Sequence, residues 1–143
     1  MTREMKFRGK DILTDKWVYG DLLHLGNAYA IVTSYEEEEL KINPISDRLE
    51  FRVEDIAGVY PETVGQFTGL LDKNGKEIYK GDIMNDPTSI CVGVVEWNSI
   101  LCQFQLSWQN MHTAADLFFM VKCGSFVIGN IHDNPELLKG GAE

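Results

Sequence analysis

The chain has 143 residues, of which 44% are hydrophobic and 24% charged, and its 22 acidic against 13 basic residues give a net charge of −9. This size and composition predict one globular domain or two small ones, and exclude a disordered chain. The acidic excess disfavours binding to nucleic-acid phosphates. No apolar run approaches the roughly 18 residues of a membrane span, and the N-terminus lacks the apolar stretch of a secretory signal. We therefore expect a cytoplasmic protein.

Short alternating segments dominate the first part of the chain. Met5–Arg8, Trp17–His24 and Tyr29–Thr33 are predicted as the first three strands, and Leu49–Val53 as a half-buried fourth. Between the third and fourth lie four consecutive glutamates, Glu36–Glu39. Consecutive side chains point in different directions on a strand or a helix, so this run is interpreted as a solvated loop or helix edge, not as a cation site.

The stretch QFTGLLDKNGKEIYKGDI, Gln66–Ile83, has the pattern of a hairpin followed by a corner. Asn74-Gly75 predicts a type I′ turn, because these two residue types best tolerate the positive φ angles that this turn requires. Gly81 permits a kink, and the carboxylate of Asp82 can accept a backbone N–H there. We expect the chain to turn this corner into a further strand.

The second part of the chain continues with short strands. Ile90–Trp97 is apolar on both faces and predicts a central strand, while Leu101–Trp108 alternates and predicts a half-buried one. Asn110–Asp116 is the least regular loop, and Leu117–Val121 and Phe126–Ile131 are predicted as the last two strands. The density of strands and turns predicts an all-β chain with less than about a sixth of its residues helical.

Two stretches, PETVGQFTGLLDKNGKEIYKGDI (Pro61–Ile83) and VIGNIHDNPELL (Val127–Leu138), resemble the YopX family of phage and prophage proteins, and Lys6–Lys10 and Trp17–Gly20 fit it as well. The resemblance implies short antiparallel strands whose C-terminal part, residues 64–143, is an SH3-like barrel. An N-terminal β region, residues 1–63, is expected to pack tightly on it, or to form one structural unit with it, because no flexible spacer separates the two. The resemblance supplies no catalytic residues.

No catalytic or metal-binding spacing is present: nucleophile and base, paired carboxylates and ligand clusters are all missing from the sequence pattern. We expect neither an enzyme nor a cofactor nor a metal site. Cys91, Cys102 and Cys123 have no paired spacing and are interpreted as small apolar residues in a reducing compartment, each in an apolar neighbourhood.

Two groups of residues are candidates for binding. Met111, His112 and Asp116 lie in the irregular loop, where function often resides, although a loop histidine without a role is the simpler interpretation. Lys73, Lys76 and Lys80 surround the central hairpin as a candidate basic patch, although lysines on strand edges also prevent aggregation.

These observations favour a phage-type accessory protein that binds another protein without catalysis. Many strand edges and the large aromatic residues Trp17, Trp97 and Trp108 would also favour a homo-oligomer. The alternative is a nucleic-acid-associated protein, which would bind directly through the lysine-bearing hairpin or act as an acidic mimic of DNA.

Overall fold

The computed structural model describes residues 4–109 and 111–139, without the side chains of residues 37–41 and 51. Within these residues the chain forms eleven strands, one α-helix and two short 3-10 helices, so the predicted all-β class is confirmed. The chain divides into two compact units, Met5–Val64 and a C-terminal unit that begins at Gly65. No helix in the described ranges has the length and apolar composition needed to cross a membrane.

The N-terminal unit is a meander in which each strand pairs antiparallel with the next. Its strands lie in the order β4-β3-β2-β1. Ile31, Val32 and Val59 are almost fully buried and form its core. The elements are β1 (Phe7–Lys10), β2 (Trp17–Leu25), β3 (Ala28–Asn43), β4 (Arg48–Val59) and the 3-10 helix η1 (Pro61–Thr63).

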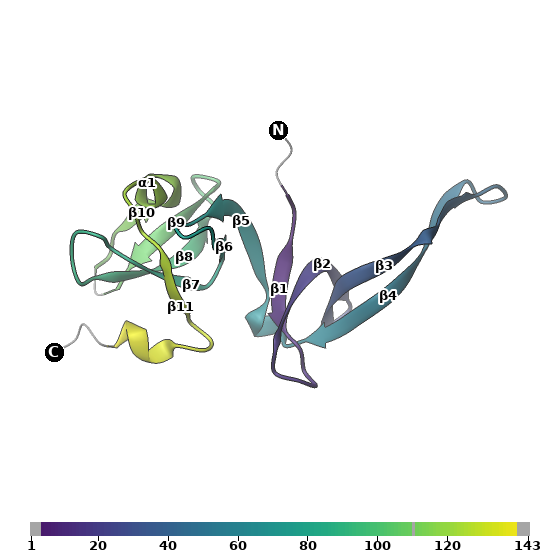
Figure 1. The fold of residues 1–143 in the computed structure, drawn as a ribbon, viewed down its shortest axis with the longest axis horizontal. Coiled ribbons are helices and arrows are strands. Elements are labelled where there is room, and N and C mark those ends of the chain that lie inside the picture. Colours follow the sequence, from purple (N-terminus) through teal and green to yellow (C-terminus); the bar gives the residue numbers. More distant parts are fainter. Residues whose placement is uncertain (1–3, 110, 140–143) are drawn as a thin grey trace. The chain divides into compact units, whose positions relative to one another are not determined.

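The hairpin of β3 and β4 continues far beyond β2 (Figure 1). β2 pairs with β3 only as far as Val32, whereas β3 and β4 remain paired out to Asn43 and Arg48. The sequence predicted a strand that ends at Thr33, because the turn residue Ser34 follows it. The register of β3 shifts between Glu36 and Lys41, which explains why no simple alternation marks the extension. We call the part beyond Val32 the β3–β4 arm.

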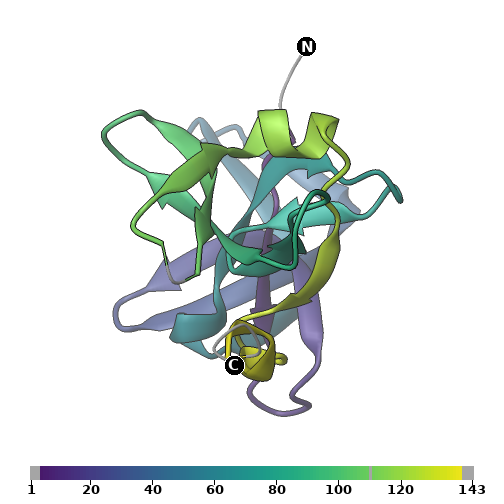
Figure 2. The ribbon, with the colours of Figure 1, turned by 90° about the vertical axis from the view of Figure 1, so that its left-hand side faces the viewer.

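The C-terminal unit contains the hairpin β5–β6 and a sheet in the order β10-β9-β8-β7-β11. Ile78, Met84, Val95, Leu106, Leu117 and Met120 form its buried core. Figure 2 shows α1 continuing from β10, and β11 leading to η2. The elements are β5 (Gly65–Leu71), β6 (Glu77–Tyr79), β7 (Asp82–Asn85), β8 (Val92–Asn98), β9 (Gln103–Trp108), β10 (Ala114–Asp116), α1 (Leu117–Lys122), β11 (Val127–Asn130) and η2 (Pro135–Leu138).

The sheets of the C-terminal unit are antiparallel, and in the described residues they are not closed into a barrel. The sheet has β10 at one edge and β11 at the other. The coarse prediction of short antiparallel strands is therefore confirmed, and the finer prediction of an SH3-like barrel is not.

The segment Leu117–Val121, predicted as a strand, is the helix α1. Leu117 and Met120 are buried, while Phe118 and Phe119 between them are exposed. A spacing of three between buried residues is the period of a helix, not of a strand. A run of five apolar residues is too short for periodicity alone to decide between the two.

The central hairpin forms where the sequence predicts it, but the type I′ turn is wrong. Gly75 has φ 80°, whereas Asn74 does not have a positive φ. The N–H of Gly75 donates to the carbonyl of Asp72 at 2.9 Å, so Lys73 and Asn74 are the central residues of the turn. This is a type I turn followed by a left-handed glycine. Asp72 selects it, because its carboxylate accepts the N–H of Asn74 at 2.8 Å.

Gly75→Val is expected to lower the free energy of unfolding by about 1–3 kcal/mol, because a β-branched residue would be held at positive φ. A Cβ at this position meets no atom within 4 Å, so the cost comes from the backbone alone. Urea denaturation measures it. Asn74→Ala is the control and should change stability by less than about 0.5 kcal/mol. Equal losses in the two variants would favour the type I′ turn after all.

Candidate functional site

One buried carboxylate joins two distant parts of the C-terminal unit. Asp72, only 6% exposed, follows β5. Its Oδ1 accepts the N–H groups of Asn74 at 2.8 Å and Lys76 at 2.9 Å. Its Oδ2 accepts the N–H of Val127, the first residue of β11, at 3.0 Å. The turn of the central hairpin is thus fastened to a strand 55 residues away.

Other polar side chains of the C-terminal unit also form hydrogen bonds with backbone groups. Asp82, 1% exposed, accepts the N–H of Tyr79 at 2.8 Å, which is the role predicted for it. The hydroxyl of Ser125 donates to the carbonyl of Asn85 at 2.7 Å. Asn85 Oδ1 in turn accepts the N–H of Phe126 at 2.8 Å. These groups satisfy backbone polar atoms at corners of the fold, as buried polar groups must.

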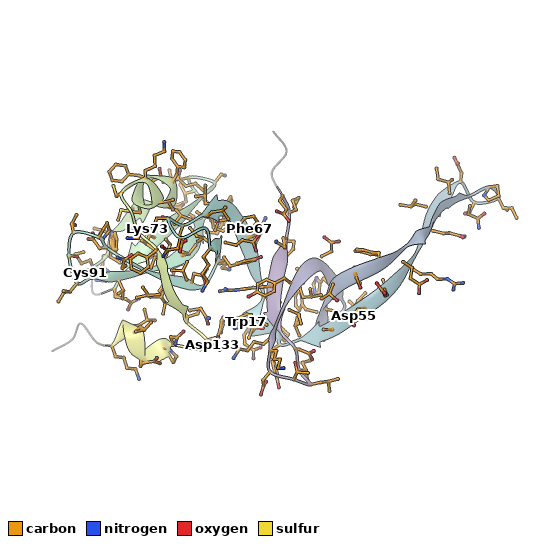
Figure 3. The ribbon with its side chains drawn as sticks, viewed as in Figure 1. Trp17, Asp55, Phe67, Lys73, Cys91 and Asp133 are labelled. Atoms are coloured by element: carbon orange, nitrogen blue, oxygen red, sulfur yellow. The ribbon has the colours of Figure 1, made fainter. Side chains whose placement is uncertain are left out.

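The segment after β11 is a turn held by its own side chains. Asn130 Oδ1 accepts the N–H groups of His132 at 3.0 Å and Asp133 at 2.9 Å. Asn134 Oδ1 accepts the N–H of Asn130 at 3.2 Å. Figure 3 labels Asp133, which lies in the segment between β11 and η2. Buried polar residues of the two stretches that carry the family resemblance, Asp72, Asp82 and Asn130, therefore hold the backbone.

The candidate loop is the connection of the β9–β10 hairpin. The N–H of Trp108 donates to the carbonyl of Thr113 at 3.2 Å and closes it. Met111 is 49% exposed and His112 is exposed at its tip, whereas Asn110 lies outside the described residues. Asp116 is also exposed, but it is the last residue of β10. The structure thus places Met111 and His112 together and Asp116 at the other end of a short strand.

Two exposed aromatic residues follow directly and were missed by sequence reasoning. Phe118 is 53% and Phe119 61% exposed on α1. The Nζ atom of Lys122 lies 5.0 Å from the centre of the Phe118 ring, a cation–π contact. The spacing of Leu117 and Met120 was the available signal, since a helix that buries both leaves the two residues between them outside. We call Met111–Lys122 the 111–122 segment.

The three candidate lysines are exposed. Lys73 and Lys76 lie on the hairpin turn, and Lys80 follows the opposite end of β6. Lys73 Nζ lies 4.6 Å from the centre of the Phe126 ring. The positive charge of Lys76 helps to lower the pKa of the Asp72 carboxylate.

Two of the three cysteines differ from the interpretation as buried apolar residues. Cys102 and Cys123 are exposed, Cys91 is half-buried, and all three are free thiols. Cys102 ends the β8–β9 turn with φ 53°, and a tight turn of this kind leaves its side chain in solvent. In the described part of the chain no three His, Cys, Asp or Glu side chains are grouped so that they could hold a metal ion.

Comparison with known proteins gives a family and a fold. The family model described as YopX protein matches residues 6–139. No curated protein matches the chain. The chain is similar to the crystal structure of protein EF1440 from Enterococcus faecalis, with 28% sequence identity and a TM-score of 0.60. That similarity covers 96% of this chain and 99% of the other.

Proposed function

The chain belongs to the YopX family, and from that premise we propose that it is a cytoplasmic phage or prophage accessory protein, a non-catalytic module that binds another protein. One contrast carries the proposal. The buried polar residues of the family-like stretches hold the backbone, as Asp72 does for Val127. The 111–122 segment instead presents large apolar side chains to solvent.

The composition of this surface suits a protein partner. Met111, Phe118 and Phe119 are each about half exposed or more. Methionine and aromatic residues are enriched in protein interfaces, and the flexible methionine side chain adapts to irregular surfaces. Lys122 beside the Phe118 ring adds one positive charge. The matching partner surface is apolar and carries a carboxylate near its edge.

The SH3-like barrel remains part of the proposal as the architecture of the C-terminal unit. Two features support it: the last strand, β11, returns to pair with β7, and the helix α1 lies between β10 and β11. Small β-barrels of this type are common recognition scaffolds that use loops and edges, which is an analogy at the level of the fold.

Capture from host cells tests the proposed function. The wild-type protein, carrying an affinity tag, is expected to retain a specific protein from an extract of host cells in which the phage cycle has been induced. Met111→Ser/Phe118→Ser should reduce recovery at least about tenfold, because interface residues of this kind dominate binding energy. The melting temperature should stay unchanged, since both side chains are exposed.

Leu101→Ser is the matched control, because Leu101 is equally apolar and 62% exposed but lies in the β8–β9 turn. It should capture the partner as the wild type does. Equal recovery by the double variant would contradict the assigned surface. Recovery of DNA in a salt-sensitive manner, or turnover of a substrate by the purified protein, would contradict protein binding itself.

A further inference from the structure

Over most of its length, the outer edge of β4 pairs with no other strand among residues 4–109 and 111–139. β4 is the terminal strand of its sheet. In the described residues, its outer partners come from the β1–β2 connection: Asp11 bridges Val59, and the N–H of Ile12 donates to the carbonyl of Gly58 at 3.0 Å. The part from Arg48 to Glu54 belongs to the β3–β4 arm, and an open strand edge is a template for a further strand.

The exposed charges of this edge alternate in sign. Arg48, Glu50, Arg52 and Glu54 are all exposed. Residues two apart share one face of a strand, so the face reads positive, negative, positive, negative. The sequence RLEFRVE is therefore self-complementary when it is read backwards about position 51.

We propose that β4 pairs antiparallel with β4 of a second copy of this chain, about a two-fold axis at position 51. This register places Arg48 opposite Glu54 and Glu50 opposite Arg52. The symmetry repeats both pairs, so four pairs of opposite charges face one another. Leu49 meets Val53 on the other face. Opposite charges and apolar pairs directly across two strands stabilise the pairing.

The same charges make pairing in the neighbouring registers unfavourable. A slide of two residues in one direction sets Arg48 against Arg52, and in the other direction it sets Glu50 against Glu54. Parallel pairing in register sets each charge against its own copy. Charged residues on an edge usually discourage pairing, and this order of charges also discourages these neighbouring registers.

The pairing also explains how a two-stranded arm is stabilised. An isolated two-stranded ribbon is marginally stable in water, whereas two arms joined through β4 form four adjacent strands. A register irregularity on the β3 side falls between Val53 and Asp55, at the end of the stretch. The test therefore uses substitutions of Glu50 and Arg52, which lie before this irregularity.

Sedimentation velocity over a micromolar range at low salt tests the proposal. The wild-type mass should rise with concentration. Glu50→Arg and Arg52→Glu should each weaken association at least about tenfold, since each turns two attractive pairs into repulsive ones. An equimolar mixture of the two variants should associate again, because their edges then carry opposite charges. Glu50→Arg/Arg52→Glu in one chain should associate like the wild type.

Lys16→Glu and Glu62→Arg are matched controls, because both residues are exposed in the same unit but lie outside β4. They should leave association unchanged. A wild-type mass that does not depend on concentration would overturn the proposal. Wild-type association in either single variant, or no recovery in their mixture, would overturn it too. The 111–122 segment takes no part in this contact, so failure here leaves the proposed function untouched.

Discussion

Asp72→Asn is expected to lower the free energy of unfolding by about 2–4 kcal/mol. The carboxylate accepts N–H groups with both oxygens, and an amide nitrogen in place of one oxygen would face a donor. A hydrogen bond to a charged group contributes about 1.5–3 kcal/mol, and a buried N–H without an acceptor adds its own cost. Either the hairpin turn or the start of β11 would lose its anchor.

Urea denaturation of both proteins measures the loss. Asp86→Asn is the matched control, because Asp86 is half-buried and its carboxylate accepts hydrogen bonds from Thr88 and Ser89 of its own turn. Its effect should be well below that of Asp72→Asn. Equal stability of wild type and Asp72→Asn would mean that the carboxylate does not fasten β11 to the hairpin.

Because of the same carboxylate, we expect the free energy of unfolding to fall at acid pH. Burial would raise the pKa of Asp72, but the N–H groups of Val127, Lys76 and Asn74 and the charge of Lys76 hold it below the ordinary value of 3.8. The unfolded chain therefore takes up this proton at higher pH than the folded one. The stabilisation is complete above the unfolded pKa and is lost as the pH falls through the folded pKa. Acid should destabilise the wild type more steeply than Asp72→Asn.

Gly20→Ala is expected to cost the N-terminal unit about 3 kcal/mol or more. A Cβ on Gly20 would lie 2.0 Å from the carbonyl oxygen of Val32. Gly20 is where β2 changes partner: it lies opposite Phe7 of β1, and the next residue, Asp21, lies opposite Val32 of β3. The atom in the way belongs to the backbone, so the two strands would have to separate.

Gly58→Ala provides the comparison for this substitution. A Cβ on Gly58 meets only Ile12 Cδ1 at 3.7 Å, an ordinary contact. Its thermal unfolding should stay close to that of the wild type. If Gly20→Ala and Gly58→Ala melt at the same temperature, the close approach of β2 and β3 at Gly20 is wrong.

Local patterns predicted much of this fold, because many strands are short and marked by turn residues. The hairpin Gln66–Ile83 and the corner at Asp82 follow directly from glycine, asparagine and aspartate chemistry. The type of the turn does not follow from these residue types alone, since it depends on hydrogen bonds accepted by the Asp72 side chain. The third strand was predicted too short, because the irregular register of β3 hides the alternation of residues in the β3–β4 arm.

The candidate site was predicted only in part. Irregular sequence marked the loop with Met111 and His112, both of which are exposed. Phe118 was missed because a strand through Leu117–Val121 would bury alternate residues, whereas the helix exposes two adjacent ones. Sequence reasoning did not place the lysines relative to β6: Lys73 and Lys76 precede this strand, and Lys80 follows it.

Calorimetric titration of the captured partner protein is the most direct test of the proposal that this chain works by binding through the 111–122 segment. Wild type and Leu101→Ser are expected to bind the partner with the same Kd. Met111→Ser/Phe118→Ser is expected to raise the Kd at least about tenfold, with circular dichroism unchanged. The same Kd for all three proteins would contradict the assignment of the binding surface to this segment.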